Sequence, residues 1–471
     1  MKEKLIAYSR DLSQIQKTRI EQKKSNKDSR LNQGTSWWWP PYTLSETWDY
    51  LKGFVTTGAS SRQNPRALLG KNTSTHVVGL KTAEIEHSAP ALNTAEDILV
   101  VGDVLFSKNG KPIVLGEALK ERIRKAKVMI LNIESPVTAD ATNTGYGRLR
   151  NILVNGLKFS LYLPESYLKA LIKDIKKENP SIEIIYDVAN NHTLDASTLP
   201  YEKMTPIEKS LYDFDRLNFP LYRTLYAIRH VIDDANAKII GAWTHEMEFK
   251  SFPTREGIRI NLQTEPVAVT RLNGLTIGFM ALTDILNNNH ALWEEGRAMR
   301  PEDVSELLDT LRAHYQLDKL YILIHGGVEQ NVYPSEHWQA LLEQLANHCD
   351  GVIGHGSHLP GLSQVLKTAR GYVFVETSLG NFFCPTNPKN TAVSTLLTMK
   401  VTDNSIQHIE EPIEALQEKG HPEVELLSEK SKGTYLGLRW FSLHQQVFPT
   451  VSQNEGKSEK TEIPMKPTAT L

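Results

Sequence analysis

The chain from Asp97 onward alternates short apolar runs with segments of helical periodicity. Seven apolar runs have the length of buried strands. These runs cover residues 98–101, 128–131, 182–188, 275–281, 320–324, 351–353 and 372–375. Between several of them, apolar residues recur every three or four positions, as on one face of a helix. The alternation predicts an α/β domain with a layered, largely internal sheet.

Two of the predicted helices have well-defined starts. Pro301, with acidic residues after it, is a favourable first position of one helix, and Ser335 is a good N-cap for the other. The apolar stripe of the first helix consists of Val304, Leu307, Leu308, Leu311 and Tyr315. That of the second consists of Trp338, Leu341, Leu342 and Leu345. Both stripes have the spacing of a helix that covers a sheet.

The two ends of the chain differ from this central part. Residues 1–30 hold nine Lys or Arg residues against four Asp or Glu residues, and few large apolar ones. The stretch that follows is rich in Ser, Thr, Asn and Gly and has no sustained periodicity. The sequence therefore predicts a basic, loop-rich N-terminal extension over residues 1–95 and a folded domain over 96–445. A disordered polar tail is predicted over 446–471.

Composition narrows the class of protein. The chain has 471 residues, of which 40% are hydrophobic and 23% charged, with a formal net charge of −2. These values are typical of a globular protein and give no electrostatic signature of nucleic-acid binding. Two cysteines form neither a disulfide scaffold nor a thiolate zinc site. No apolar run is long enough to span a membrane, so we expect a cytoplasmic protein. The expected substrate is a small molecule or a polymer.

The polar residues that follow the apolar runs are the candidates for chemistry. They are Asp103, Glu134, Asn191, His192, His325, His355 and His358. Ligands of open α/β sheets bind beyond the carboxyl ends of the strands, where such residues meet. Oxygen and imidazole ligands suit Mn²⁺, Fe²⁺ or Zn²⁺, and a carboxylate can bridge two ions about 3.5–4 Å apart. Taken singly, each residue also fits a turn, a helix cap or a structural hydrogen bond. The joint pattern predicts a site for one or two divalent metal ions.

Six motifs in these positions resemble a known family. In chain order they are GDVLF at 102–106, NIESPVT at 132–138, ANNHTLD at 189–195, HGGVE at 325–329, GHGSH at 354–358 and SLGNFF at 378–383. They occur in the order seen in CapA-type proteins, a bacterial family linked to poly-γ-glutamate capsule synthesis and similar to calcineurin-like metallophosphoesterases. The resemblance covers roughly residues 97–415. It implies an αββα-type layered sandwich and a metal-dependent hydrolase.

The resemblance also implies roles for the individual ligands. Asp103 resembles the metal ligand of the first strand, and Glu134 takes the place of the bridging carboxylate. Asn191 resembles an amide ligand. His325 and His358 resemble the imidazole ligands of the later strands.

Three further residues are implied in catalysis rather than in metal binding. His192 resembles the histidine that contacts the phosphate and its leaving group. Asp195 and Glu329 would orient imidazoles from behind the ligands.

This sequence departs from the family pattern at three positions. Leu105 stands where classical metallophosphoesterases have the histidine of Asp-x-His, and Gly326 stands where the family has tryptophan. Gly356 occupies the place of an imidazole in the usual His-Pro-His motif. We expect His355 to replace this imidazole, because a glycine beside it frees the backbone to turn the ring toward the site. The alternative is that His355 packs on the other face and a single ion binds.

Two functions from different classes fit the sequence. The first is a metal-dependent hydrolase of a phosphoester or a related bond, in which a bound ion activates water and His192 acts as the acid or stabilises the transition state. The second is a non-catalytic component of a poly-γ-glutamate or polysaccharide synthesis or export assembly, with capsule-synthesis partners. The changes at Leu105 and Gly356 favour the second function, whereas the retained ligands favour the first. A serine hydrolase is disfavoured because these motifs include no Gly-x-Ser-x-Gly elbow.

Overall fold

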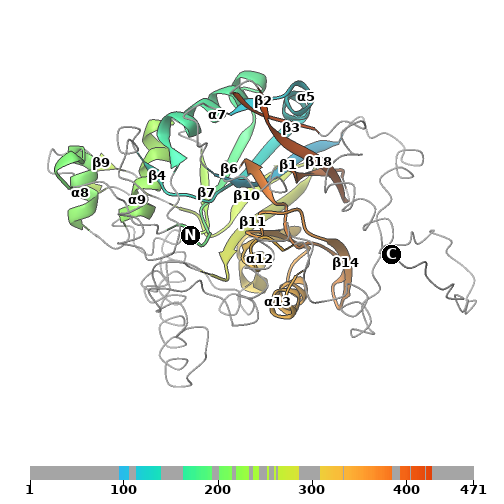
Figure 1. The fold of residues 1–471 in the computed structure, drawn as a ribbon. Helices are drawn as coiled ribbons and strands as arrows, with labels where there is room; N and C mark the ends of the chain where they lie inside the picture. Colours follow the sequence, from blue (N-terminus) through green and yellow to red (C-terminus); the bar gives the residue numbers. More distant parts are fainter. Residues whose placement is uncertain are drawn as a thin grey trace, which may run out of the picture.

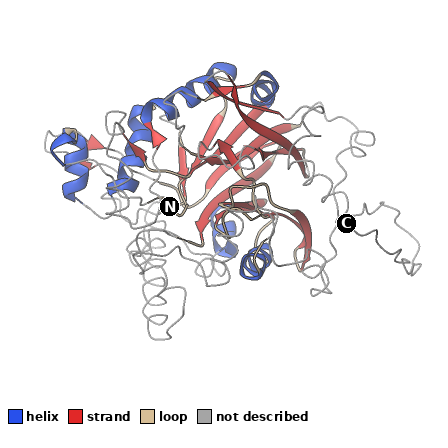
Figure 2. Ribbon diagram, viewed as in Figure 1, coloured by secondary structure: helices blue, strands red, loops and turns tan. Residues whose placement is uncertain are grey.

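The computed structural model describes the central part of the chain (Figures 1 and 2). The residues it describes are 95–105, 113–138, 163–193, 201–214, 219–232, 237–242, 252–253, 259–260, 262, 264–285, 308–331, 334–383, 393–403, 405–418 and 421–426. The predicted extension (apart from its last residue), the predicted tail and Asp195 lie outside these residues.

The first of two large sheets within the described residues is mixed. Its spatial order is β2 (Val114–Leu115), β19 (His421–Leu426), β18 (Ile406–Glu418), β17 (Val393–Val401), β1 (Glu96–Val104), β3 (Ala126–Ile133), β6 (Glu183–Asp187) and β7 (Lys238–Ile240). The short strand β16 (Asn381–Phe383) also pairs with β1. Strands β1, β3, β6 and β7 are parallel, so their carboxyl ends meet at one edge.

The second large sheet has a parallel centre with antiparallel edges. Its order is β10 (Ala268–Leu272), β11 (Leu275–Thr283), β12 (Lys319–His325), β13 (Gly351–His355), β15 (Gly371–Glu376) and β14 (Ser363–Thr368). Strands β11, β12, β13 and β15 are parallel. All seven apolar runs predicted as strands coincide with strands of these two sheets, and most of their residues are buried.

Helices cover the outer faces of both sheets. On the first sheet lie α5 (Glu117–Lys125) and α7 (Glu165–Glu178), and on the second α12 (Leu308–Tyr315) and α13 (Glu336–Ala346), at opposite sides of Figure 1. Alternate residues of β1 show the layering: Leu99 and Val101 pack toward the helices, whereas Ile98 and Val100 face the other sheet. The predicted αββα layering is therefore confirmed.

Shorter elements lie beside the first sheet. They are η4 (Tyr201–Lys203), α8 (Pro206–Phe214), α9 (Phe219–Tyr226), the π-helical turn η5 (Ala227–Val231), and the strand pairs β4 (Val137–Thr138) with β5 (Leu163–Pro164) and β8 (Phe252–Pro253) with β9 (Arg259–Ile260). Thr224 on α9 accepts a hydrogen bond from the backbone of Val137 at 2.9 Å. This bond ties the short helices to the segment that follows β3.

The structure describes one of the two predicted helix starts. The Ser335 hydroxyl accepts a hydrogen bond from Trp338 N at 3.2 Å, so the predicted N-cap and its helix are confirmed. The later part of the other predicted helix is α12, while its predicted start at Pro301 lies outside the described residues. Among the helices of the described part, none is long and apolar enough to cross a membrane.

Candidate metal centre

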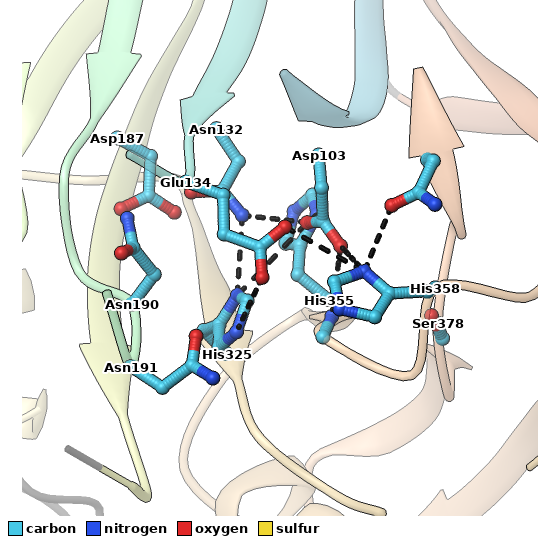
Figure 3. A network of polar contacts seen from close by, with 12 residues as sticks. Asp103, Asn132, Glu134, Asp187, Asn190, Asn191, His325, His355, His358 and Ser378 are labelled. Atoms are coloured by element: carbon cyan, nitrogen blue, oxygen red, sulfur yellow. Dashed lines mark hydrogen bonds and ion pairs between the residues drawn. The ribbon is translucent and has the colours of Figure 1, made fainter. Parts of the chain in front are cut away.

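Strand pairing brings two rows of polar side chains to the carboxyl ends of the sheets. In the first sheet, Asp103 pairs in register with Asn132, which pairs with Asp187 on the next strand. In the second sheet, His325 pairs with His355. Partner residues on neighbouring parallel strands point to the same face. The carboxylates of one sheet therefore meet the imidazoles of the other (Figure 3).

The centre of the cluster alternates carboxylates with imidazoles. Asp103 Oδ1 lies 3.3 Å from His355 Nδ1, and Asp103 Oδ2 lies 3.5 Å from His358 Nδ1. Glu134 Oε2 lies 3.6 Å from the same His358 nitrogen, and Glu134 Oε1 lies 3.6 Å from His325 Nε2. Ligand atoms from Asp103, Glu134 and His358 all lie within 4.8 Å of one another. The three residues offer two carboxylates and an imidazole to a common point.

Two glycines permit the close approaches that build this cluster. A Cβ at Gly102 would lie 1.9 Å from the carbonyl oxygen of Gly380, the same oxygen to which Asp103 N donates at 2.9 Å. Gly356 has φ +102°, and a Cβ there would lie 2.8 Å from His325 Nε2. The left-handed turn at Gly356, continued by His358 at φ +60°, returns the chain to the site.

His355 reaches the site for a different reason from the one predicted. Its ring reaches Asp103 and does not pack on the opposite face. The regular register of β13 beside β12 directs it there, since His355 is the strand partner of His325. The freedom of Gly356 serves instead the turn that follows the strand. Whether His355 binds an ion stays a prediction.

The loop after β6 supplies the remaining predicted residues. Asn191 Nδ2 lies 3.5 Å from Glu329 Oε1. Asn190 Nδ2 donates to the carbonyl of Ile133 at 2.8 Å, and Asn190 Oδ1 accepts from His192 N at 3.1 Å. These bonds fix the loop against the end of β3. His192 is buried in the loop.

Burial and mutual contacts set the charges of the cluster. Burial raises the pKa of Asp103, but the adjacent rings of His355 and His358 outweigh it, and the pKa falls below its usual range. Burial lowers the pKa of His325 to about 3, against an opposing effect of Asp103. Burial also disfavours the charged form of His358, but the neighbouring Glu134 and Asp103 raise its pKa well above the ordinary value. Asp103 is therefore ionised and His325 neutral near neutral pH.

The atoms present fit a divalent ion. Among the described residues, hydrogen-bond partners are lacking for several buried atoms of the cluster, including both ring nitrogens of His355, His325 Nε2 and Asn191 Oδ1. A buried polar atom without a partner is costly, so such atoms point to a ligand. Carboxylate, amide and imidazole donors without thiolates match the preferences of Mn²⁺, Fe²⁺ and Zn²⁺.

Three buried residues of the cluster received no role from the sequence. Asn132 Nδ2 donates to Asp103 Oδ1 at 2.7 Å, and Asn381 Oδ1 lies 2.9 Å from His358 Nδ1. Burial raises the pKa of Asp187 well above its usual value. Asn132 directly follows the apolar run 128–131, and this signal was sufficient to find it. Asp187 lies inside the apolar run 182–188, so its position in the sequence did not indicate that it belongs to the site.

Comparisons with known proteins add little to this geometry. No family model matches the chain. No curated protein matches it either. Solved structures similar to it include a hypothetical protein from Thermus thermophilus, at 10% identity and TM-score 0.31, over 69% of this chain and 95% of that one. Another is the sulfate thiohydrolase SoxB of Thermus thermophilus in complex with glycerol, at 11% identity and TM-score 0.31. That match covers 77% of this chain and 62% of the SoxB chain.

Proposed function

We propose that this protein is a metal-dependent hydrolase with its centre at the carboxyl ends of β1, β3, β12 and β13. The observation that carries the proposal is the convergence of Asp103, Glu134 and His358, whose ligand atoms lie within 4.8 Å of one another. All three side chains are buried. Ionised carboxylates and imidazoles are rarely buried together unless they are paired or hold a metal.

In this proposal Asp103, Glu134 and His358 hold the first ion, which is Mn²⁺, Fe²⁺ or Zn²⁺. When bound, such an ion lowers the pKa of a water molecule and polarises the bond that is hydrolysed. His355 contacts the same Asp103 oxygen as Asn132 does and belongs to the same donor set. Asn191 and His325 are the residues that would be expected to hold a second ion.

His192 is the proposed proton donor to the leaving group. Its backbone is tied to Asn190, which is itself fixed to the end of β3. The side chain of His192 is buried in the loop after β6. Glu329 contacts Asn191 and orients that amide. Asp195, which we propose to act in the same way on His192, lies outside the described residues.

The proposed substrate is defined only by the bond that is hydrolysed. The bond that is hydrolysed is a phosphoester or a related acyl or amide bond. Sequence motifs alone support a place in poly-γ-glutamate capsule synthesis, with partners from that assembly. A polymer of anionic residues is consistent with a site centred on divalent ions, because the ions neutralise both the buried carboxylates and the substrate.

Activity measurements on matched variants test the proposal. We expect protein loaded with Mn²⁺, Zn²⁺ or Fe²⁺ to hydrolyse p-nitrophenyl phosphate, bis-p-nitrophenyl phosphate or poly-γ-glutamate, and Asp103→Asn to lose this activity. Asp97→Asn is the control, since Asp97 is a largely buried carboxylate on the same strand, where it pairs with Lys400 instead. Equal activity in Asp103→Asn and the control would count against hydrolysis at this centre.

A second candidate function is a non-catalytic role in a polymer-synthesis or export assembly. One observation favours it: Leu105, at the position of a metal-binding histidine in classical metallophosphoesterases, is 2% exposed and packs as an apolar residue. Its backbone N donates to Phe383 O at 3.0 Å, which holds this position, directly after β1, against β16. Metal binding without activity on any of the three substrates would favour this second role.

A further inference from the structure

The amide of Asn132 has a defined orientation in the cluster. Its Nδ2 lies 2.7 Å from Asp103 Oδ1, and both side chains are buried. Asp103 lies between the rings of His355 and His358, at 3.3 and 3.5 Å. Its Oδ1 accepts the hydrogen bond that the amide of Asn132 donates. The amide end that faces Asp103 is therefore the NH₂ group.

The same NH₂ group determines the tautomer of His325. Asn132 Nδ2 lies 3.2 Å from His325 Nδ1, and an amide NH₂ has two hydrogens and only donates. One hydrogen goes to Asp103 and the other to His325 Nδ1. Nδ1 must then carry its lone pair and no proton. A neutral imidazole with a bare Nδ1 carries its proton on Nε2.

His325 Nε2 lies on the inner side of the cluster. Its side chain is fully buried, and within the described part of the chain Nε2 has no hydrogen-bond partner. It lies 3.6 Å from Glu134 Oε1, and Gly356 packs so closely that an added Cβ would lie 2.8 Å from it. An imidazole binds a metal through a lone pair, but the lone pair of Nδ1 is engaged by Asn132 and Nε2 has none. A buried N–H without an acceptor calls for one.

We infer that Asn132 positions His325 with its proton on Nε2, so that His325 donates a hydrogen bond to an anionic oxygen of a bound ligand and does not bind the ion. The oxygen belongs to a phosphoryl or a carboxyl group. This inference rests on the proposed function for the presence of an ion beside His325. It changes the expected role of His325 from metal ligand to a donor that stabilises negative charge on the substrate.

Nitrogen NMR tests the tautomer without any metal. In metal-free protein labelled with ¹⁵N-histidine, long-range ¹H–¹⁵N spectra distinguish the two tautomers, and His325→Gln identifies the signal. We expect the Nε2–H pattern in the wild type and the Nδ1–H pattern in Asn132→Asp, because a carboxylate at this position needs a donor. An Nδ1–H pattern in the wild type overturns the inference, whether or not the Asn132→Asp variant folds.

Binding measurements test the role. His325→Ala is expected to bind Zn²⁺ within about threefold of the wild type, whereas His358→Ala loses Zn²⁺. Zn²⁺-loaded His325→Ala is expected to bind inorganic phosphate, or acetate as the carboxyl probe, about tenfold or more weakly, as for loss of a hydrogen bond to a charged group. His325→Gln, which keeps an N–H, should recover part of this loss and serves where the alanine variant does not fold.

The outcomes separate this inference from the proposed function. A loss of Zn²⁺ in His325→Ala as large as that in His358→Ala makes His325 a ligand and overturns the inference. Unchanged affinity for both phosphate and acetate also overturns it. A wild type that binds no divalent ion refutes the proposed function instead, while the tautomer spectrum still decides the role of Asn132.

Discussion

Replacing Gly356 by alanine is expected to destabilise the protein through two separate effects. The residue has φ +102°, where a side chain costs about 1–3 kcal/mol. An added Cβ would also lie 2.8 Å from His325 Nε2 and 2.9 Å from the carbonyl oxygen of Gly326, and overpacking of this kind costs about 1–3 kcal/mol. Alanine also lowers the conformational entropy of the unfolded chain, which offsets about 0.4–1 kcal/mol of this loss of stability. The expected net loss is about 3 kcal/mol.

Gly371 provides a control that contains only one of the two effects. It has φ +115°, but no heavy atom would lie within 4 Å of an added Cβ. The free energy of unfolding of Gly371→Ala should therefore fall only by the cost of the backbone conformation, about 1–2 kcal/mol. Urea unfolding of both metal-free variants, followed by circular dichroism, gives the difference, which we expect to be about 1–3 kcal/mol. Equal losses would refute the close packing of Gly356 against His325.

Two further substitutions test the layers around the site. Burial lowers the pKa of His408 to about 3, so this ring, stacked on Phe374 at 4.2 Å between centroids, is neutral in the folded state. The contribution of neutral His408 to the free energy of unfolding is full above the unfolded pKa of about 6.5. It is lost as the pH falls from about 6.5 toward 3, because the unfolded chain takes up a proton that the folded chain does not. Between these pH values, the stability of His408→Phe, measured by urea unfolding, should therefore fall less steeply than that of the wild type. Ser335→Ala removes the N-cap of α13 and should cost about 1 kcal/mol in urea unfolding, whereas an unchanged stability would show that the cap bond contributes nothing.

The sequence predicted those parts of the fold that local patterns determine. Each of the seven predicted apolar runs lies in a strand, and the polar residue that follows a run lies at or near the carboxyl end of that strand, as at Asp103 and His325. The N-cap at Ser335 is likewise local. Such features need only short-range information, because hydrophobic periodicity and capping act over a few residues.

The remaining features depend on which strands become neighbours. Asn381 reaches the site because β16 pairs with β1, in a register that sets it beside Asp103 across 278 positions of sequence separation, the difference between 381 and 103. The direction of the His355 ring follows from its pairing with His325, and no local pattern at 355 records that register. The tautomer set by Asn132 requires distances between two different sheets. These properties arise only when the chain is folded.

The central claim is that Asp103, Glu134 and His358 hold a divalent ion. Anomalous diffraction at the zinc edge, from crystals grown with Zn²⁺, locates such an ion directly. We expect an anomalous peak about 2.0–2.2 Å from a carboxylate oxygen of Asp103, a carboxylate oxygen of Glu134 and a ring nitrogen of His358. The same measurement on Glu134→Gln should show a weaker peak or none. A wild-type map without a peak between these three side chains, or with zinc bound only elsewhere, would contradict the account.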